Sequence, residues 1–163
     1  MPELSCFRGS LPGLGSEIRP QALSPEAVSA VVQELAEGLE PRRRQLLKAC
    51  LLLWNDRLEA AHTIVQEQEG DQEADCLHAI MHRREPDEGN SCYWWARVGP
   101  HPLGAELATE AGRLGLNSLV GIDGIFQPKA MTRACCRANL PVPSLSDLQA
   151  CELRLVGARL LAS

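Results

Sequence analysis

Two histidines lie four residues apart, His78 and His82, within the segment HAIMHRREPDEGNSCYWW of residues 78–95. Side chains at positions i and i+4 lie on one face of a helix, so a helix here would present both imidazoles together. Such pairs are common by chance, and Ala79 stands where the HExxH zinc motif has its glutamate. The pair alone is therefore weak support for a metal site.

A line of polar residues in the preceding segment strengthens this interpretation. It runs beside an apolar stripe, at spacings of four, three and four, through Asn55, Glu59, His62 and Gln66. The EGDQ turn at 69–72 makes the two predicted helices antiparallel neighbours, so we expect His62 to converge on His78 and His82. Three imidazoles suit Zn or Fe, with one coordination position left open for chemistry. The alternative is that His62 and His78 are satisfied histidines at the edge of the core and that His82 is solvated.

Three carboxylates accompany the histidines in the sequence. Glu59 and His62 form an E-x-x-H pair, the helical spacing used by di-metal carboxylate bundles, but a single pair does not support a di-iron set. Glu85 continues the line of the two later histidines, although the proline after it disfavours helix at that position. Glu85 is predicted to join the metal ligands or the catalytic carboxylates, and Glu59 or Asp87 to act as the general base.

A further group of residues is typical of a ligand pocket with aromatic walls and a few polar groups. Arg84 falls in an apolar sector of its helix, where a buried guanidinium needs an acidic partner, and the nearest candidates are Glu59, Glu85 and Asp87. Arg84 and Arg97 are expected to clamp an anionic substrate group or to stabilise developing charge. The predicted substrate-binding residues are Arg84, Asn90, Tyr93, Trp94, Arg97 and His101. In the simpler alternative the aromatic residues belong to the core, the second arginine snorkels to solvent and the histidine lies in an exposed loop.

About seven helices joined by short loops would position these residues, and no segment indicates a convincing strand. Ser24 and Pro25 have the residue types of a helix start, and Ser144 and Asp147 have the spacing of a capping box. Residues 115–126 fit a loop or a short extended piece. The predicted helices cover about 25–37, 41–54, 56–68, 73–84, 88–98, 102–114, 128–138 and 146–162, the second and third with little or no break between them.

Length and composition limit the class of protein. The 163 residues suit one helical domain over 24–163, an antiparallel bundle or a short solenoid-like array, preceded by a loosely ordered arm over 1–23. The net charge of −5 argues against a broad nucleic-acid surface. No signal peptide or membrane span is recognisable, and seven cysteines without a C-x-x-C pair fit a reducing cytoplasm.

The block HAIMHRREPD…N…YWWARVGPHP, preceded by LLLWNDRLEAAHTI, resembles a family of small uncharacterised helical proteins of bacteria and fungi. The closing LQACELRLVGARLL is similar too, so the resemblance spans residues 45–160 and implies a helical fold without a mechanism. Cys92 stands where the family leads us to expect a basic residue, and Glu88 where we expect an aromatic one. The family's motif falls on Asp56, His62, His78, His82, Arg83, Arg84, Glu85, Asp87, Asn90, Tyr93, Trp94, Arg97 and His101.

The leading hypothesis is a small enzyme with a site between the helices over 51–68, 73–84 and 88–98. In this hypothesis one Zn or Fe ion on His62, His78 and His82 assists hydrolysis or lyase chemistry on a small anionic molecule. A metal-free acid–base enzyme uses the same residues. The hypothesis from another class is a helical-repeat-like module that binds a protein or peptide and whose histidines are structural. An enzyme would enclose its polar residues in a pocket, whereas a module would display them on an open concave face.

Overall fold

The computed structural model describes the chain except for residues 1–4, 8–10, 139–141 and 163. The described part is all-helical, with eight α-helices packed on one another and no strand, so the predicted fold class is confirmed. No helix in this part is long and apolar enough to cross a membrane. The α-helices are α1 (Pro25–Leu35), α2 (Pro41–Trp54), α3 (Leu58–Gln66), α4 (Gln72–Arg84), α5 (Glu88–Val98), α6 (Gly104–Arg113), α7 (Pro128–Cys136) and α8 (Pro143–Leu161).

Local sequence explains most of the helix starts. The Ser24 side chain accepts a hydrogen bond from the backbone of Ala27, and Pro25 occupies the first helical position of α1. Asp71 caps α4 in the same way, and Asp87 caps α5 by accepting from the Asn90 backbone amide. The start of α8 differs from the prediction, because the helix already begins at Pro143 and its N-terminus has no side-chain cap. Ser144 therefore lies inside the first turn, and the predicted capping box is wrong.

The boundary between α2 and α3 is sharper than predicted. Asn55 ends α2, and Asp56 adopts a left-handed backbone with a φ of 59°, which the right-handed helix cannot contain. The two helices are therefore separate and their helical phases are not continuous. Asn55 is buried, accepts a hydrogen bond from the backbone of Leu23 and donates to Leu51. Consequently it does not extend the polar line of α3, as we had predicted from a continuous helix.

Residues 115–126, predicted as a loop or a short extended piece, contain a short 3₁₀-helix, Asn117–Leu119. An isolated antiparallel bridge between Val120 and Phe126 follows it. The bridge closes a tight loop whose Gly124 has a φ of 76°, a conformation that favours glycine. Phe126 is buried and Ile122 at the tip is fully exposed. The segment is thus a loop whose Leu119 and Phe126 side chains are buried in the core.

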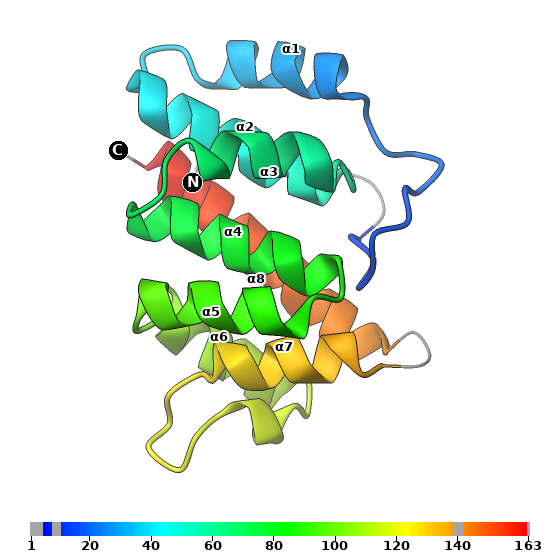
Figure 1. Cartoon of the computed structure of the whole chain (residues 1–163), viewed down its shortest axis with the longest axis vertical. Coiled ribbons are helices and arrows are strands. Elements are labelled where there is room, and N and C mark those ends of the chain that lie inside the picture. The colour runs from blue at the N-terminus through cyan, green and yellow to red at the C-terminus, as the bar shows by residue number, and fades with distance from the viewer. Residues whose placement is uncertain (1–4, 8–10, 139–141, 163) are drawn as a thin grey trace.

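The packing places the histidine-bearing helix in the middle of the molecule. Helix α4 lies between α3 and α5 in the row of helices that Figure 1 shows from α1 downward, and α8 crosses behind this row. Helices α2 and α4 are buried along most of their length, because α2 packs on α1, α3, α4 and α8 while α4 packs on α3, α5 and α7. Any side chain on α4 that is not apolar must therefore find a partner on a neighbouring helix.

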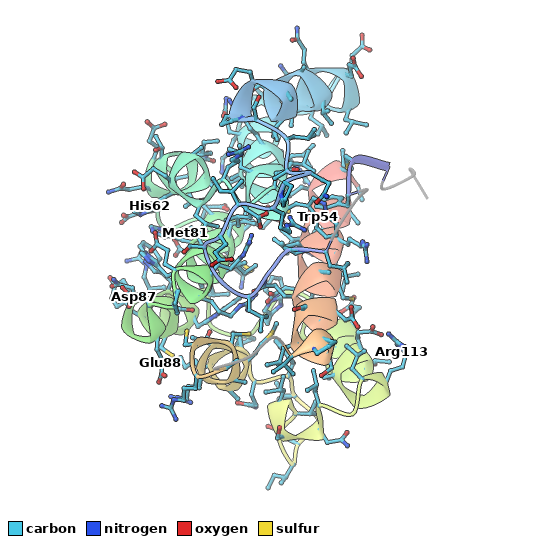
Figure 2. All side chains as sticks on the ribbon, turned by 90° about the vertical axis from the view of Figure 1, so that its right-hand side faces the viewer. Trp54, His62, Met81, Asp87, Glu88 and Arg113 are labelled. Carbon is cyan, nitrogen blue, oxygen red and sulfur yellow. The ribbon has the colours of Figure 1, made fainter. Side chains whose placement is uncertain are left out.

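The described part of the N-terminal arm is fastened to this core. Phe7 packs edge-on against Trp54, at a ring-centroid distance of 5.2 Å, and lies against Gly157 of α8. A Cβ atom at position 157 would lie 2.3 Å from the Phe7 ring, so glycine is required there. Further along, Arg19 binds the carboxylate of Asp56. Figure 2 shows this part of the chain crossing the front of the helices near Trp54.

Candidate metal centre between helices α3, α4 and α5

Three histidines from two helices meet at one point. His62 of α3 faces His78 and His82 of α4, and the three residues each offer a ligand nitrogen within 4.8 Å of the other two. The ring centroids are 4.8 Å apart for His62 and His78, 5.4 Å for His62 and His82, and 5.0 Å for His78 and His82. His62 is partly exposed on the outer side of α3, as Figure 2 shows, so the group can be reached from solvent.

His78 is the innermost of the three. Its ring stacks on the indole of Trp94, with centroids 3.8 Å and planes 19° apart. Its Nδ1 is buried and has no hydrogen-bond partner among the described residues. Burial, and then the neighbouring His82, His62 and Arg97, lower the pKa of His78 to about 3. His78 is therefore neutral at physiological pH and can offer a ring lone pair to a ligand.

His82 is held by a carboxylate. Its Nδ1 lies 2.9 Å from Oε2 of Glu85, the residue that ends α4 three positions later. The hydrogen bond leaves Nε2 of His82 as the nitrogen that can bind a ligand. A carboxylate on the far nitrogen of an imidazole fixes the ring orientation and raises the basicity of the other nitrogen, as it does around many metal ions. Glu85, predicted to lie with the histidines, thus contacts one of them, His82, through a hydrogen bond.

Helix α5 packs on α4 and places aromatic and basic side chains next to His78. The guanidinium carbon of Arg97 lies 4.9 Å from the centre of the Trp94 ring and 6.0 Å from that of Tyr93. Arg97 also contacts Asp75 at 3.3 Å and the Tyr93 hydroxyl at 3.5 Å. Because Trp94 also stacks on His78, Arg97 is the predicted substrate-binding arginine that lies near the histidines, unlike Arg84.

Asp87 and Asn90 bind one another at the start of α5. The Asp87 carboxylate accepts hydrogen bonds from the backbone and the side-chain amide of Asn90, at 2.9 and 2.7 Å. The backbone hydrogen bond is the largest cause of a lowered pKa for Asp87. A carboxylate that is already bound in this way is a weaker base. Asp87 therefore serves as a helix cap in this structure.

Arg84 points away from the histidines. Its guanidinium is fully buried and donates hydrogen bonds to the Asp56 carboxylate and to the Leu53 carbonyl. Because a buried guanidinium needs such partners, Arg84 fastens α4 to the boundary between α2 and α3 and cannot clamp a substrate at the histidines. The partner is Asp56, whereas the sequence had suggested Glu59, Glu85 or Asp87.

His101 belongs to a second buried cluster on the far side of α4. Its Nε2 lies 3.2 Å from Glu152 of α8, and Glu152 also binds the buried guanidinium of Arg83. The Arg83 Nε donates to Gln149 at 3.1 Å. His101 is buried, so the expectation that it completes the substrate pocket is wrong, and so is the exposed-loop alternative. Arg83 was named only through the family resemblance, and Gln149 and Glu152 were not predicted, although these two polar residues lie three apart on one face of α8.

The second cluster includes the thiol of Cys76 but does not form a cysteine–histidine nucleophile. The Cys76 sulfur is 3.9 Å from Nε2 of His101. Nδ1 of His101 accepts a hydrogen bond from the Leu103 backbone, so Nε2 carries the proton and donates it to Glu152. It cannot take a proton from the thiol, whose pKa is raised well above its ordinary value by burial. The cluster therefore holds the core together.

A surface pocket of about 500 Å³ opens beside Glu85, and none of the three histidines lines it. It lies between arm residues 16–25 and the start of α3, and Glu59 and Glu85 both line it. Glu85 connects the pocket with the histidines, because the same side chain binds His82. Glu59 and Thr63 line the pocket from α3.

Comparison with known proteins adds no relative. No protein-family model, no curated protein and no solved structure matches this chain.

Proposed function

We propose that this protein is a small metal-dependent hydrolase or lyase whose ion, Zn or Fe, is held by His62, His78 and His82. The observation that carries the proposal is the convergence of three imidazoles from two helices, with the buried Nδ1 of His78 left without a partner. An unpaired buried polar atom is costly, and a bound ion or water at the cluster is one way to satisfy it.

The distances are close to those of a coordination site. In a tetrahedral zinc site with Zn–N bonds of about 2.0–2.1 Å, the ligand nitrogens lie about 3.3 Å apart. The three nitrogens here lie within 4.8 Å of one another, so each pair has to approach by at most about 1.5 Å for one ion to bind all three. Three protein ligands leave a fourth position for a substrate, the arrangement of catalytic rather than structural zinc sites.

Each neighbouring side chain supports one part of this function. Glu85 fixes the ring of His82, and stacking on Trp94 fixes the ring of His78. When bound, the ion supplies Lewis-acid chemistry and lowers the pKa of water. Arg97 lies beside His78 and suits an anionic group of the substrate.

Glu59 is the carboxylate that remains for contact with a substrate. Glu85 binds His82 and Asp87 caps α5, whereas the carboxylate of Glu59 has neither ion pair nor hydrogen bond among the residues that the structure describes. It is exposed and lies one helical turn before His62. It can therefore meet a ligand, or take a proton from one, next to the ion.

The function is tested with chromogenic carboxylic and phosphoric esters and amides on protein loaded with Zn or with Fe. We expect turnover by one loaded form, its loss on chelation, and its loss in His78→Phe, which keeps a flat ring against Trp94. As a matched control, His101→Phe alters a buried histidine outside the centre. Turnover that survives in His78→Phe contradicts the proposed metal centre, and no turnover by either loaded form contradicts the hydrolase form of the proposal.

A further inference from the structure

The pocket between the arm and α3 has an apolar side. Ile18, Pro25, Leu58 and Ala60 line it, and Ile18 is 55% exposed, one of the large hydrophobic side chains that the fold leaves uncovered. An exposed apolar side chain inside a concave surface favours a ligand with an apolar body that covers it.

The polar side chains that line the pocket are three carboxylates, two hydroxyls and one guanidinium. Arg57 directs its guanidinium at the arm, donating to the carbonyls of Leu23 at 2.8 Å and Ala22 at 3.4 Å. The Asp56 carboxylate is buried and neutralised by Arg19 and Arg84. Arg57 keeps its positive charge but directs N–H groups at the arm, so the charged groups that offer free acceptor atoms to a ligand are the two remaining carboxylates.

These two carboxylates belong to Glu59 and Glu85. Glu59 has no partner among the described side chains, and Glu85 uses only Oε2 toward His82. Both line the pocket, one from α3 and one from the end of α4. A ligand that complements two carboxylates above an apolar surface carries a cation or several N–H donors on an apolar body.

We propose that this pocket binds a small organic amine, with its ammonium group between Glu59 and Glu85 and its apolar part against Ile18 and Leu58. The ammonium group is then the ligand group that the carboxylate of Glu59 contacts. That the amine is part of a substrate rests on the proposed function, because Glu85 joins the pocket to His82. That the pocket binds an amine does not rest on a metal ion.

The arm gives the pocket a fixed wall. Arg19 binds Asp56 and the backbone of Leu23 binds Asn55, on both sides of the boundary between α2 and α3. The apolar wall that Ile18 supplies is therefore held in place before a ligand arrives, which lowers the entropic cost of binding.

The test uses the full chain, stripped of metal with a chelator, and amide NMR spectra recorded during titration. The probes are hexylammonium, hexanol and hexanoate, which share an apolar body and differ in charge. We expect hexylammonium to shift the amide resonances of residues 16–18 and 57–60 in a saturable manner. Hexanol and hexanoate should bind at least about tenfold more weakly, since they lose a charge-assisted hydrogen bond.

Two variants complete the test. Glu59→Gln should weaken hexylammonium binding about tenfold, while Glu106→Gln, an exposed change on α6 outside the pocket, should leave it unchanged. Hexanoate or hexanol binding as tightly as hexylammonium, or an unchanged affinity in Glu59→Gln, overturns the proposal. Because no metal is present, failure of the metal centre leaves this result untouched, and amine binding would not by itself support the metal centre.

Discussion

The ring of His78 stacks on Trp94 at a centroid distance of 3.8 Å, and the guanidinium of Arg97 lies 4.9 Å from the same indole. An aromatic side chain from α5 thus contacts both a metal-ligand candidate and a candidate substrate-binding cation. Because of this contact, we expect metal binding at the histidines to change the fluorescence of Trp94.

Binding of Co²⁺, a common substitute for Zn²⁺, should therefore quench part of the tryptophan fluorescence in a saturable manner. The stacking predicts that Trp94→Phe removes most of this change. Trp54→Phe should retain it, because Trp54 packs on Phe7 and Arg154 in another part of the core. Equal loss of quenching in both variants would place the ion elsewhere.

The low pKa of His78 predicts a pH dependence of stability. The pKa is about 3 in the folded chain and about 6.5 when unfolded, so the unfolded state binds more protons between these values. The free energy of unfolding should therefore fall as the pH drops from 6.5 toward 3, and this contribution is fully present only above 6.5. Urea unfolding from pH 7.5 to 4 would measure the slope.

His78→Phe serves as the control for that slope, because phenylalanine retains the stacking surface and cannot be protonated. The variant should lose less stability on acidification than the natural chain does. Parallel curves for the two proteins over this pH range would show that His78 titrates normally.

The hydrogen bond between His82 and Glu85 predicts a selective effect on metal affinity. Glu85→Gln should weaken Zn²⁺ binding by about 10–100-fold, the usual effect of losing a carboxylate behind a histidine ligand. Glu85 is exposed at the end of α4, so thermal stability without metal should change little. Competition titration with a chromophoric chelator gives the affinity, and an unchanged value would remove Glu85 from the site.

The buried contact between Arg83 and Glu152 predicts a large effect on folding. Glu152→Gln leaves the guanidinium without its counter-charge, which should lower the free energy of unfolding by about 3–5 kcal/mol. The exposed change Glu106→Gln should cost less than about 0.5 kcal/mol. The double variant Arg83→Met/Glu152→Leu should recover much of the loss in urea unfolding, whereas no recovery would show that the cluster has another role.

How much the sequence predicts depends on how local each contact is. The approach of His62 to His78 and His82 follows from helical spacing and one short turn, because α3 and α4 are neighbours in the chain. The prediction for Asn55 failed, since the left-handed backbone of Asp56 interrupts the helix and helical periodicity does not register such a break.

Contacts between distant segments could not be predicted in this way. Arg84 is 28 residues from its partner Asp56, and Arg83 is 69 residues from Glu152. Helical periodicity places both arginines on faces of α4, but it does not say which helix covers each face. The presence of a partner for Arg84 was predictable from the cost of burying a charge, while the identity of that partner depends on how the end of α2 packs on α4.

The most direct test of the metal centre is elemental analysis, combined with Zn²⁺ and Fe²⁺ titration, of protein purified without a histidine tag or added metal. The three converging imidazoles predict about one ion per chain on titration. They also predict that the ion is lost in the double variant His78→Phe/His82→Phe but kept in His101→Phe, while both variants remain folded by circular dichroism. Binding well below one ion per chain, or equal binding by the natural chain and the double variant, would contradict the account.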